Sequence, residues 1–404
     1  MKIKTILYNN LTQILISILL FVNITMYNKN TLMIYIILST IIFCITIIYC
    51  WKEKEILKKL IKLPAFWWLT LVFIMYEIYG LFFKTYTEFN WDYMLFLYLT
   101  IISVVLLLMK EKDISSTIVN ASVISSLMSI IYVCIREESS LLSGNIRIGV
   151  SASGNVITFA TYLCLLSIPV LYEAFYSKKR KSIYIIIYCI QLLFMLLTGS
   201  KKVLIVALIS VVVFSIYKYR LDFRKYIIIL ISILLISIAV IKIPFLRDII
   251  GARTIDFLAE LGFNVESHTE SRSTMLRESM YKEAPIMFKD NPIFGGGWGY
   301  FAAHSITGLY SHCNYIEILI TFGIIGFLLY YVEYVIIFIK LLNKKYDGNK
   351  ILWIVLLISI FVSDLTSITF YLIPICYIML FGANIFILNE EKKIGEKNRR
   401  KNEE

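Results

Sequence analysis

Long apolar stretches separated by short polar segments make up most of this 404-residue chain. A membrane-spanning helix needs about 20 mostly apolar residues. Twelve stretches approach this length, and they predict transmembrane helices at residues 8–27, 31–50, 64–83, 92–109, 114–135, 154–176, 183–199, 202–217, 226–245, 313–340, 351–369 and 371–388. We therefore expect an all-α, polytopic membrane protein in which residues 1–404 form a single domain.

The composition supports this prediction. Hydrophobic residues make up 59% of the chain and charged residues only 17%, whereas soluble domains are about a quarter charged. The same values exclude intrinsic disorder, which requires few apolar residues and many charges. The seven cysteines include no Cys-x-x-Cys pair and lie mostly within apolar stretches, so we interpret them as small buried hydrophobes.

The basic residues predict the orientation in the membrane. If the N-terminus is cytoplasmic, the segments on the inner side hold 27 of the 40 Lys and Arg residues. Cytoplasmic loops carry such an excess in membrane proteins. We therefore expect a multi-pass protein of the cell membrane, in contact with its lipids, with both termini in the cytoplasm. The net charge of +12 is then explained without a nucleic-acid partner.

One predicted extracytoplasmic loop, residues 246–312, is too long for a simple connection. It holds all three histidines of the chain, His268, His304 and His312. Helices are predicted over 252–261 and 271–290, and an apolar stripe on the second suits packing against the bundle or the bilayer surface. The stripe comprises Met275, Leu276, Met280, Ala284, Met287 and Phe288.

Glycines follow the second of these helices at positions 295, 296, 297 and 299. Such backbone can approach a ligand closely and direct N–H groups at an anion, so Gly295 and Gly297 are candidate binding residues. The alternative is a flexible turn into the next span. The nearby Gly-x-Gly pattern lacks the strand and helix of a dinucleotide site. The histidine spacings match no common zinc site, and we expect neither a metal nor a cofactor.

Cationic residues are predicted at three extracytoplasmic positions: Arg147, the pair Lys201 and Lys202, and the pair Arg272 and Arg277. Arginine forks and lysine charges together can neutralise a diphosphate. Each of these residues alone can equally be a lipid headgroup contact or part of a solvated face. Arg272 and Arg277 are about 140° apart around a helix, so both cannot face one phosphate equally.

A histidine and two polar residues stand at the mouth of a predicted span. His312 can move a proton, Glu317 lies one helical turn along and can hold its ring, and Asn314 lies between them. Deeper in the spans, Glu77 and Asp364 are intramembrane acids, which are functional candidates by default. Buried pairing with a tyrosine or lysine explains them equally well.

Several of these motifs resemble the O-antigen ligase/polymerase superfamily, which includes Wzy-like polymerases and lipid A core–O-antigen ligases. That pattern is an Arg, an aromatic four residues on, a Pro-x-x-Gly-x-Gly turn, and a His-Asn-x-x-Leu segment ahead of Gly-x-x-Gly. Matching positions are Arg277, Tyr281, Pro292, Gly295, His312, Gly323 and Gly326. The turn at 198–201 and the Arg147…Asn155 segment are also similar. Cys313 stands where the family has Asn, and Lys201 where it has Arg.

The resemblance implies a metal-independent glycosyltransferase that polymerises oligosaccharide repeat units carried on polyprenyl diphosphate, at the outer face of the membrane. It implies His312 and Arg277 as catalytic residues. Substrate contacts are expected at Arg147, Lys201, Lys202, Arg272, Gly295, Gly297, Asn314 and Glu317. A flippase and a chain-length regulator are candidate partners. The alternatives are a ligase with a different acceptor, and a flippase, which would place its polar groups at the bilayer midplane.

Overall fold

The computed structural model of the chain describes residues 2–25, 32–51, 53–87, 91–143, 148–220, 242, 272–343, 345–346 and 349–403. Within these ranges every regular element is a helix, as predicted from the apolar pattern. The predicted helix 252–261, His268, Arg147 and, apart from residue 242, the predicted span 226–245 lie outside the described residues.

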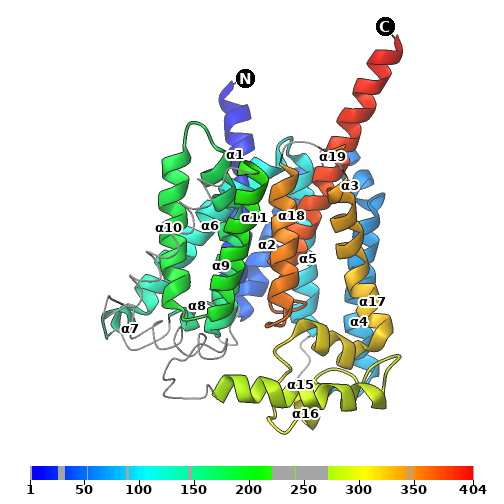
Figure 1. Cartoon of the computed structure of the whole chain (residues 1–404). Helices are drawn as coiled ribbons and strands as arrows, with labels where there is room; N and C mark the ends of the chain where they lie inside the picture. Colours follow the sequence, from blue (N-terminus) through cyan, green and yellow to red (C-terminus); the bar gives the residue numbers. More distant parts are fainter. Residues whose placement is uncertain are drawn as a thin grey trace.

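Long helices form an upright bundle with its axes roughly parallel (Figure 1). Its members are α1 (Lys2–Thr25), α2 (Leu32–Trp51), α4 (Pro64–Phe82), α5 (Trp91–Lys110), α6 (Ile114–Arg136), α9 (Val156–Tyr176), α10 (Lys181–Leu197), α11 (Lys201–Tyr219), α17 (Asn314–Leu342), α18 (Lys350–Asp364) and α19 (Ile375–Glu403). Shorter helices are α3 (Lys54–Ile61), α7 (Glu138–Ser143), α8 (Val150–Ser153) and α16 (Tyr300–His304). The helix α15 (Arg272–Asp290) crosses one end of the bundle.

Each predicted span that the structure describes overlaps one of these bundle helices. By length and composition, seven of the described helices qualify as membrane-crossing, and two shorter apolar helices lie at Leu11–Thr25 and Lys181–Leu197. The predicted count of twelve transmembrane helices is therefore not confirmed, although the all-helical, multi-pass character is.

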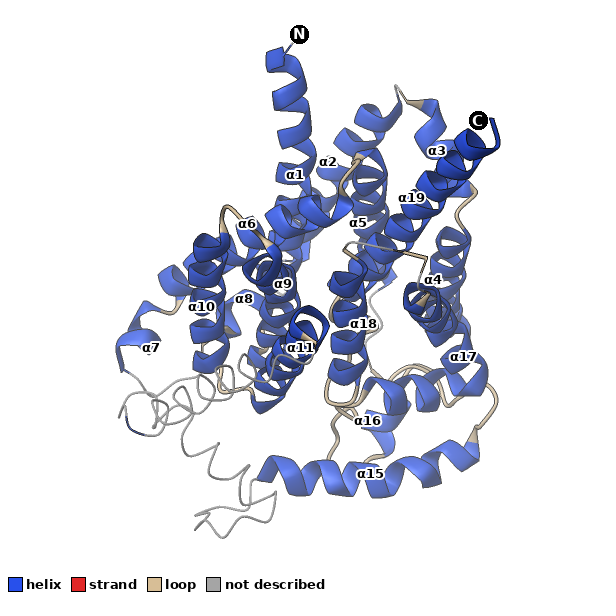
Figure 2. Cartoon of the chain, turned by 45° about the horizontal axis from the view of Figure 1, so that its top comes forward, coloured by secondary structure: helices blue, strands red, loops and turns tan. Residues whose placement is uncertain are grey.

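The two ends of the bundle differ. Both chain termini project from one end, which we call the termini end, and α15 and α16 lie across the opposite end, the α15 end (Figures 1 and 2). The turns that follow α4, α10 and α18 reach the α15 end as well. Segments far apart in sequence thus meet there.

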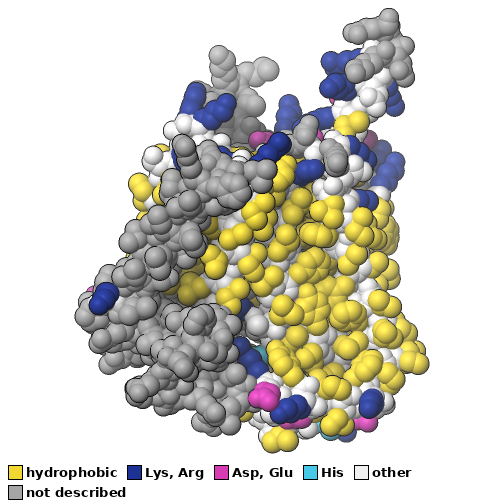
Figure 3. All heavy atoms as spheres, viewed as in Figure 1, with side chains coloured by type: hydrophobic (Ala, Val, Ile, Leu, Met, Phe, Trp, Pro, Cys, Tyr) yellow, Lys and Arg dark blue, Asp and Glu magenta, His cyan; other side chains and the backbone are white. Residues whose placement is uncertain are grey.

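The sides of the bundle are apolar. Figure 3 shows hydrophobic side chains covering α17 and α18, with Lys and Arg at the two ends of the bundle. Large apolar side chains such as Leu71, Ile186 and Leu328 are exposed on these sides, as expected for surfaces in contact with lipid. The bundle interior holds an aromatic core in which Tyr76 packs against Phe322 and Phe370, with ring centroids 5.4 and 5.5 Å away.

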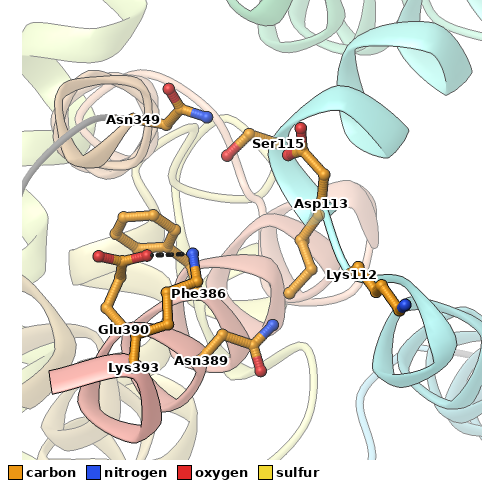
Figure 4. A pocket seen from close by; sticks show the side chains of 9 residues that line it. Lys112, Asp113, Ser115, Asn349, Phe386, Asn389, Glu390 and Lys393 are labelled. Carbon is orange, nitrogen blue, oxygen red and sulfur yellow. Dashed lines mark hydrogen bonds and ion pairs between the residues drawn. The ribbon is translucent and has the colours of Figure 1, made fainter. Parts of the chain in front are cut away.

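The termini end holds paired charges and an open cavity. Lys110 contacts Glu53 at 3.1 Å and lies 3.4 Å from the centre of the Tyr49 ring. The cavity, of about 390 Å³, is lined by the turn before α6, by Asn349, and by α19 from Phe386 to Lys393. Figure 4 shows Asn349 across its opening from Glu390 and Lys393, which form an ion pair of 2.7 Å.

Candidate functional site

The start of α11 brings two lysines to the α15 end. Helix α10 ends at Leu197, and Gly199 adopts a left-handed conformation (φ 64°) that reverses the chain in a short turn. Lys201 and Lys202 then occupy the first turn of α11. Cations there oppose the positive end of the helix dipole, so this geometry is unfavourable unless an anion is nearby.

Helix α15 carries Arg277 and Tyr281 on the side that faces the bundle. Its buried stripe, Met280, Ala284 and Met287, packs on Phe301 and Ile320, which confirms the predicted amphipathic packing. The Tyr281 hydroxyl, one helical turn after Arg277, donates to the carbonyl oxygen of Leu365 at 3.3 Å. This contact ties α15 to the turn after α18. The backbone of Arg272 lies in the first turn of α15, but the placement of its side chain lies outside the described part of the structure.

His312 lies in the loop between α16 and α17, directly before Cys313, the residue that precedes the first turn of α17. Its backbone is left-handed (φ 55°), a conformation that non-glycine residues adopt uncommonly and that often occurs at functional sites. Its ring lies against Tyr310, with centroids 4.3 Å apart. The side chain is half-buried.

The electrostatics place His312, Arg277 and Lys202 together. Burial, together with the positive charges of Arg277 and Lys202, lowers the pKa of His312 to about 4. Lys202 in turn donates to the hydroxyl of Ser367 in the turn after α18. Four segments thus meet here: the start of α11, α15, the loop before α17 and the turn after α18. We call His312, Arg277 and Lys202 the cationic site. At neutral pH its imidazole is uncharged.

Asn314 lies beneath the cationic site within a buried hydrogen-bond network. Its Nδ2 donates to the Tyr331 hydroxyl at 2.9 Å and to the Asp364 carboxylate at 3.3 Å. Its Oδ1 accepts from the backbone N–H groups of Thr369 and Phe370 at 2.9 and 3.1 Å. The side chain is fully buried. Asn314 therefore supports the turn after α18. All of its side-chain hydrogen-bonding groups already have partners within the protein, so none is left for the predicted contact with substrate.

Asp364 completes this network. Its carboxylate accepts from the hydroxyls of Tyr331 and Thr369 at 2.8 and 2.5 Å. The buried acid is thus hydrogen-bonded, the arrangement that burial of a carboxylate requires. Of the two predicted alternatives for Asp364, pairing with a tyrosine is the one that the structure contains.

Glu317 does not hold the ring of His312. Its buried carboxylate accepts from the backbone N–H of Ser311 at 2.9 Å. The bond fixes the loop that carries His312, one residue before it. The predicted role therefore needs correction: Glu317 positions the histidine through the backbone and not through the imidazole.

The glycine-rich segment is part of the scaffold and does not present its N–H groups to a ligand. Helix α17 is broken at Gly323 (φ 65°, ψ −169°). The segment 292–297 inserts at this break. The N–H groups of Gly296 and Gly297 donate to the carbonyl oxygens of Ile320 and Thr321 at 2.8 and 3.1 Å, and that of Ile324 donates to Pro292 at 2.9 Å. These bonds satisfy backbone groups that the break would leave unpaired in an apolar environment.

Close packing explains why glycine stands at these positions. A Cβ on Gly295 would lie 2.5 Å from the backbone nitrogen of Gly323, and one on Gly297 would lie 2.5 Å from the carbonyl oxygen of Lys84. The N–H of Gly295 donates to Asn291 at 2.9 Å. The N–H groups of Gly295 and Gly297 thus have backbone partners, and a contact of these residues with the substrate stays a prediction.

Other residues at this end were not predicted from the sequence. The buried carboxylate of Glu137 accepts from the N–H groups of Gly149 and Ser151 at 2.8 and 2.6 Å, and so holds the segment that enters α9. Tyr310 contacts both His312 and, through its hydroxyl, Asn155. Its position beside the histidine follows from loop geometry, for which an isolated tyrosine gives no sequence signal.

Residues 185–331 match the family model described as O-antigen ligase. This segment contains the whole cationic site, the break in α17 and the inserted glycine turn, and the match confirms the resemblance to the O-antigen ligase/polymerase superfamily. No curated protein matches the chain.

Proposed function

We propose, from the similarity of residues 185–331 to the O-antigen ligase family and from the cationic site, that this protein is a membrane glycosyltransferase whose donor is an oligosaccharide on polyprenyl diphosphate. It joins repeat units into a polysaccharide at the outer face of the cell membrane. The single observation that carries the proposal is the convergence of His312, Arg277 and Lys202 from three separate segments.

The charge of the site suits the leaving group of this reaction. Breaking the glycosyl–oxygen bond leaves a polyprenyl diphosphate with its negative charge on the departing oxygen. Arg277 is a fixed cation that stabilises this charge as it develops, and the ammonium form of Lys202 adds a second positive charge beside it. Among the described residues, neither side chain forms an ion pair with a carboxylate, and Lys202 donates to the hydroxyl of Ser367. The chemistry then needs no divalent cation for charge neutralisation.

The neutral imidazole of His312 suits the acceptor. Because burial and the two nearby cations keep the imidazole uncharged, one ring nitrogen can accept a hydrogen bond from the attacking hydroxyl and orient it toward the sugar carbon. The hydroxyl oxygen forms the new bond to the sugar carbon as the bond from that carbon to the diphosphate breaks. The imidazole of His312 takes up the hydroxyl proton. Attack opposite the leaving group inverts the sugar carbon.

A ligase is the second candidate function, because the matched family model carries that description. The chemistry at the cationic site is then unchanged, and only the acceptor differs. A polymerase accepts another lipid-linked repeat unit, whereas a ligase accepts a different molecule.

The direct test uses the purified full-length protein and a polyprenyl-diphosphate repeat unit with excess EDTA. We expect longer lipid-linked products, and His312→Ala protein should give none. Products that form only after another acceptor is added would support the ligase. Loss of turnover in EDTA that Mg²⁺ restores would contradict the metal-free mechanism, and no transfer by wild-type protein under any of these conditions would reject the glycosyltransferase.

The sidedness has its own test. In a cysteine-free variant, a cysteine replacing the exposed Lys289 on α15 should react with an impermeant thiol reagent in intact cells or spheroplasts. A cysteine replacing the exposed Lys392 on α19 should react only after lysis. The reverse labelling would place the cationic site in the cytoplasm and contradict the proposed location.

A further inference from the structure

A second set of side chains at the α15 end lies apart from the cationic site. The rings of Tyr300 and His304 are stacked with centroids 4.0 Å apart, and the ring of Tyr86 meets both at steep angles, at 5.4 and 5.0 Å. We call Tyr86, Tyr300 and His304 the aromatic surface. His304 is exposed, and both tyrosines are half-buried.

The aromatic surface is built on fixed backbone. The N–H of Tyr86 donates to the carbonyl oxygen of Trp298 at 2.9 Å, which ties the turn after α4 to the glycine turn. A Cβ on Gly299 would collide with the Thr87 side chain, so the two turns lie in direct contact. A ring nitrogen of His304 lies 2.9 Å from the carbonyl oxygen of Tyr300. These contacts hold the rings in place without a ligand.

Charges of both signs surround the rings. The Lys84 ammonium lies 4.7 Å from the centre of the Tyr86 ring, and the exposed Asp290 accepts from the Tyr300 hydroxyl at 3.4 Å. A surface that binds lipid tails would lack these charges, and a site that binds only an ion would not need three aromatic rings. A sugar has an apolar C–H face and a rim of hydroxyls, so it matches aromatic rings flanked by hydrogen-bonding groups.

The length of α15 between Arg277 and Asp290 gives the distance between the cationic site and the aromatic surface. Asp290 follows Arg277 by thirteen residues of one helix, which at 1.5 Å per residue is about 20 Å. That distance is too long for contact with the bond being made. It suits sugar residues further along the same oligosaccharide.

We infer that the aromatic surface is a subsite for the oligosaccharide, several sugar residues away from the bond that is formed at His312. The inference rests on the proposed function, and it adds a contact that affects affinity for the glycan and leaves the chemical step unchanged.

The test measures binding and turnover separately. The probe is free oligosaccharide released from the host's own surface polysaccharide, and its dissociation constant is measured with the purified full-length protein in lipid nanodiscs. Tyr86→Ala and the exposed His304→Ala should each weaken binding, about tenfold for the tyrosine, and raise KM similarly while kcat changes less than twofold. Tyr86→Phe should restore binding because it keeps the ring. Lys282→Ala, which removes an exposed α15 cation paired with Glu278, is the matched control and should bind as wild type.

Unchanged binding in both alanine variants would overturn the inference, as would a fall in kcat without a change in dissociation constant. Lower stability in nanodiscs with normal oligosaccharide binding would identify the rings as a membrane-interface anchor instead, which also overturns it. The two proposals fail separately. Wild-type protein that binds the oligosaccharide but transfers nothing would reject the glycosyltransferase alone, and transfer with unaffected variants would reject the subsite alone.

Discussion

Cationic residues are used in opposite ways at the termini end and around His312. At the termini end, Lys345 and Lys393 pair with Glu391 and Glu390 at 3.3 and 2.7 Å, and Lys110 contacts both an acid and a ring. Around His312 the cations instead lie close to one another, and each disfavours protonation of the same imidazole.

The difference separates anchoring from binding. A cation next to a carboxylate is locally neutral and needs nothing else, as is typical of residues that fix a helix end at the membrane surface. Cations that share a half-buried site repel each other and attract an anion. Basic residues therefore point to the ligand site where the fold gives them no ion-paired carboxylate among the described residues.

The largest expected effect is that of His312→Ala. Loss of a group that orients or moves the acceptor proton lowers kcat by about 10²- to 10⁴-fold, while the amount of protein in the membrane stays the same. Polymer length on gels and single-turnover transfer measure the effect. Polymer of normal length would remove His312 from the mechanism.

Arg277→Ala should reduce kcat about 10²- to 10³-fold, as expected for a lost stabiliser of developing charge. Arg277→Lys should recover only part of this, because an ammonium cannot form the planar fork. Lys345→Ala, at the termini end, is the control and should retain nearly full transfer. Equal effects of the two alanine variants would abolish the distinction between the ends, and a larger effect of Arg272→Ala would mean that the wrong side of α15 was assigned to the diphosphate.

The α15 end also depends on backbone shape, which Gly323→Ala tests. The left-handed φ costs an alanine about 1–2 kcal/mol, and its Cβ would overlap the carbonyl oxygen of Ile293. Gly308 has nearly the same φ (66°) but open space around it. We expect Gly323→Ala to lower the thermal stability in detergent clearly more than Gly308→Ala. Equal losses would show that the inserted turn contributes nothing beyond backbone conformation.

The pH profile of transfer should show the effect of the neighbouring cations on His312. An ordinary histidine titrates near pH 6.5, whereas the pKa of His312 is lowered to about 4. The imidazole stays neutral above that value, so kcat/KM should hold as the pH falls and decrease only as it passes through about 4. Removing a positive charge with Lys202→Met makes protonation easier and should move this decrease to higher pH. A decrease near pH 6.5 in wild type, unmoved in the variant, would contradict the proximity of the three groups.

The smallest effect is expected at the termini end. Glu391→Gln removes the charge that pairs with the partly exposed Lys345, and exposed pairs contribute about 0–1 kcal/mol. The melting temperature in detergent should fall only slightly and transfer should be unaffected. A loss of transfer there would link the two ends and refute their separation.

The sequence predicted well what depends on local pattern. Apolar length located the described helices, the stripe on α15 predicted its buried face, and motif spacing singled out Arg277 and His312, which the structure places near each other. Tertiary contacts could not be predicted in this way. The run 313–340 looks like one uninterrupted span, and nothing local reveals that residues 292–297 insert beside Gly323. For the same reason Gly295, Gly297, Asn314 and Glu317 were assigned to the substrate, although their partners are backbone groups and Asp364.

The break in α17 also bears on how deep the histidine loop lies in the membrane. Residues 324–342 span about 28 Å at 1.5 Å per residue, close to the ~30 Å hydrocarbon thickness of a bilayer. The part that precedes Gly323 turns aside from this long segment in Figure 1. The length of residues 324–342 therefore matches the thickness of the hydrocarbon core. One end of this segment lies at the termini end of the bundle, and under the proposed function the other end and the histidine loop lie at the level of the lipid headgroups, where the diphosphate of a membrane-embedded donor would also reside.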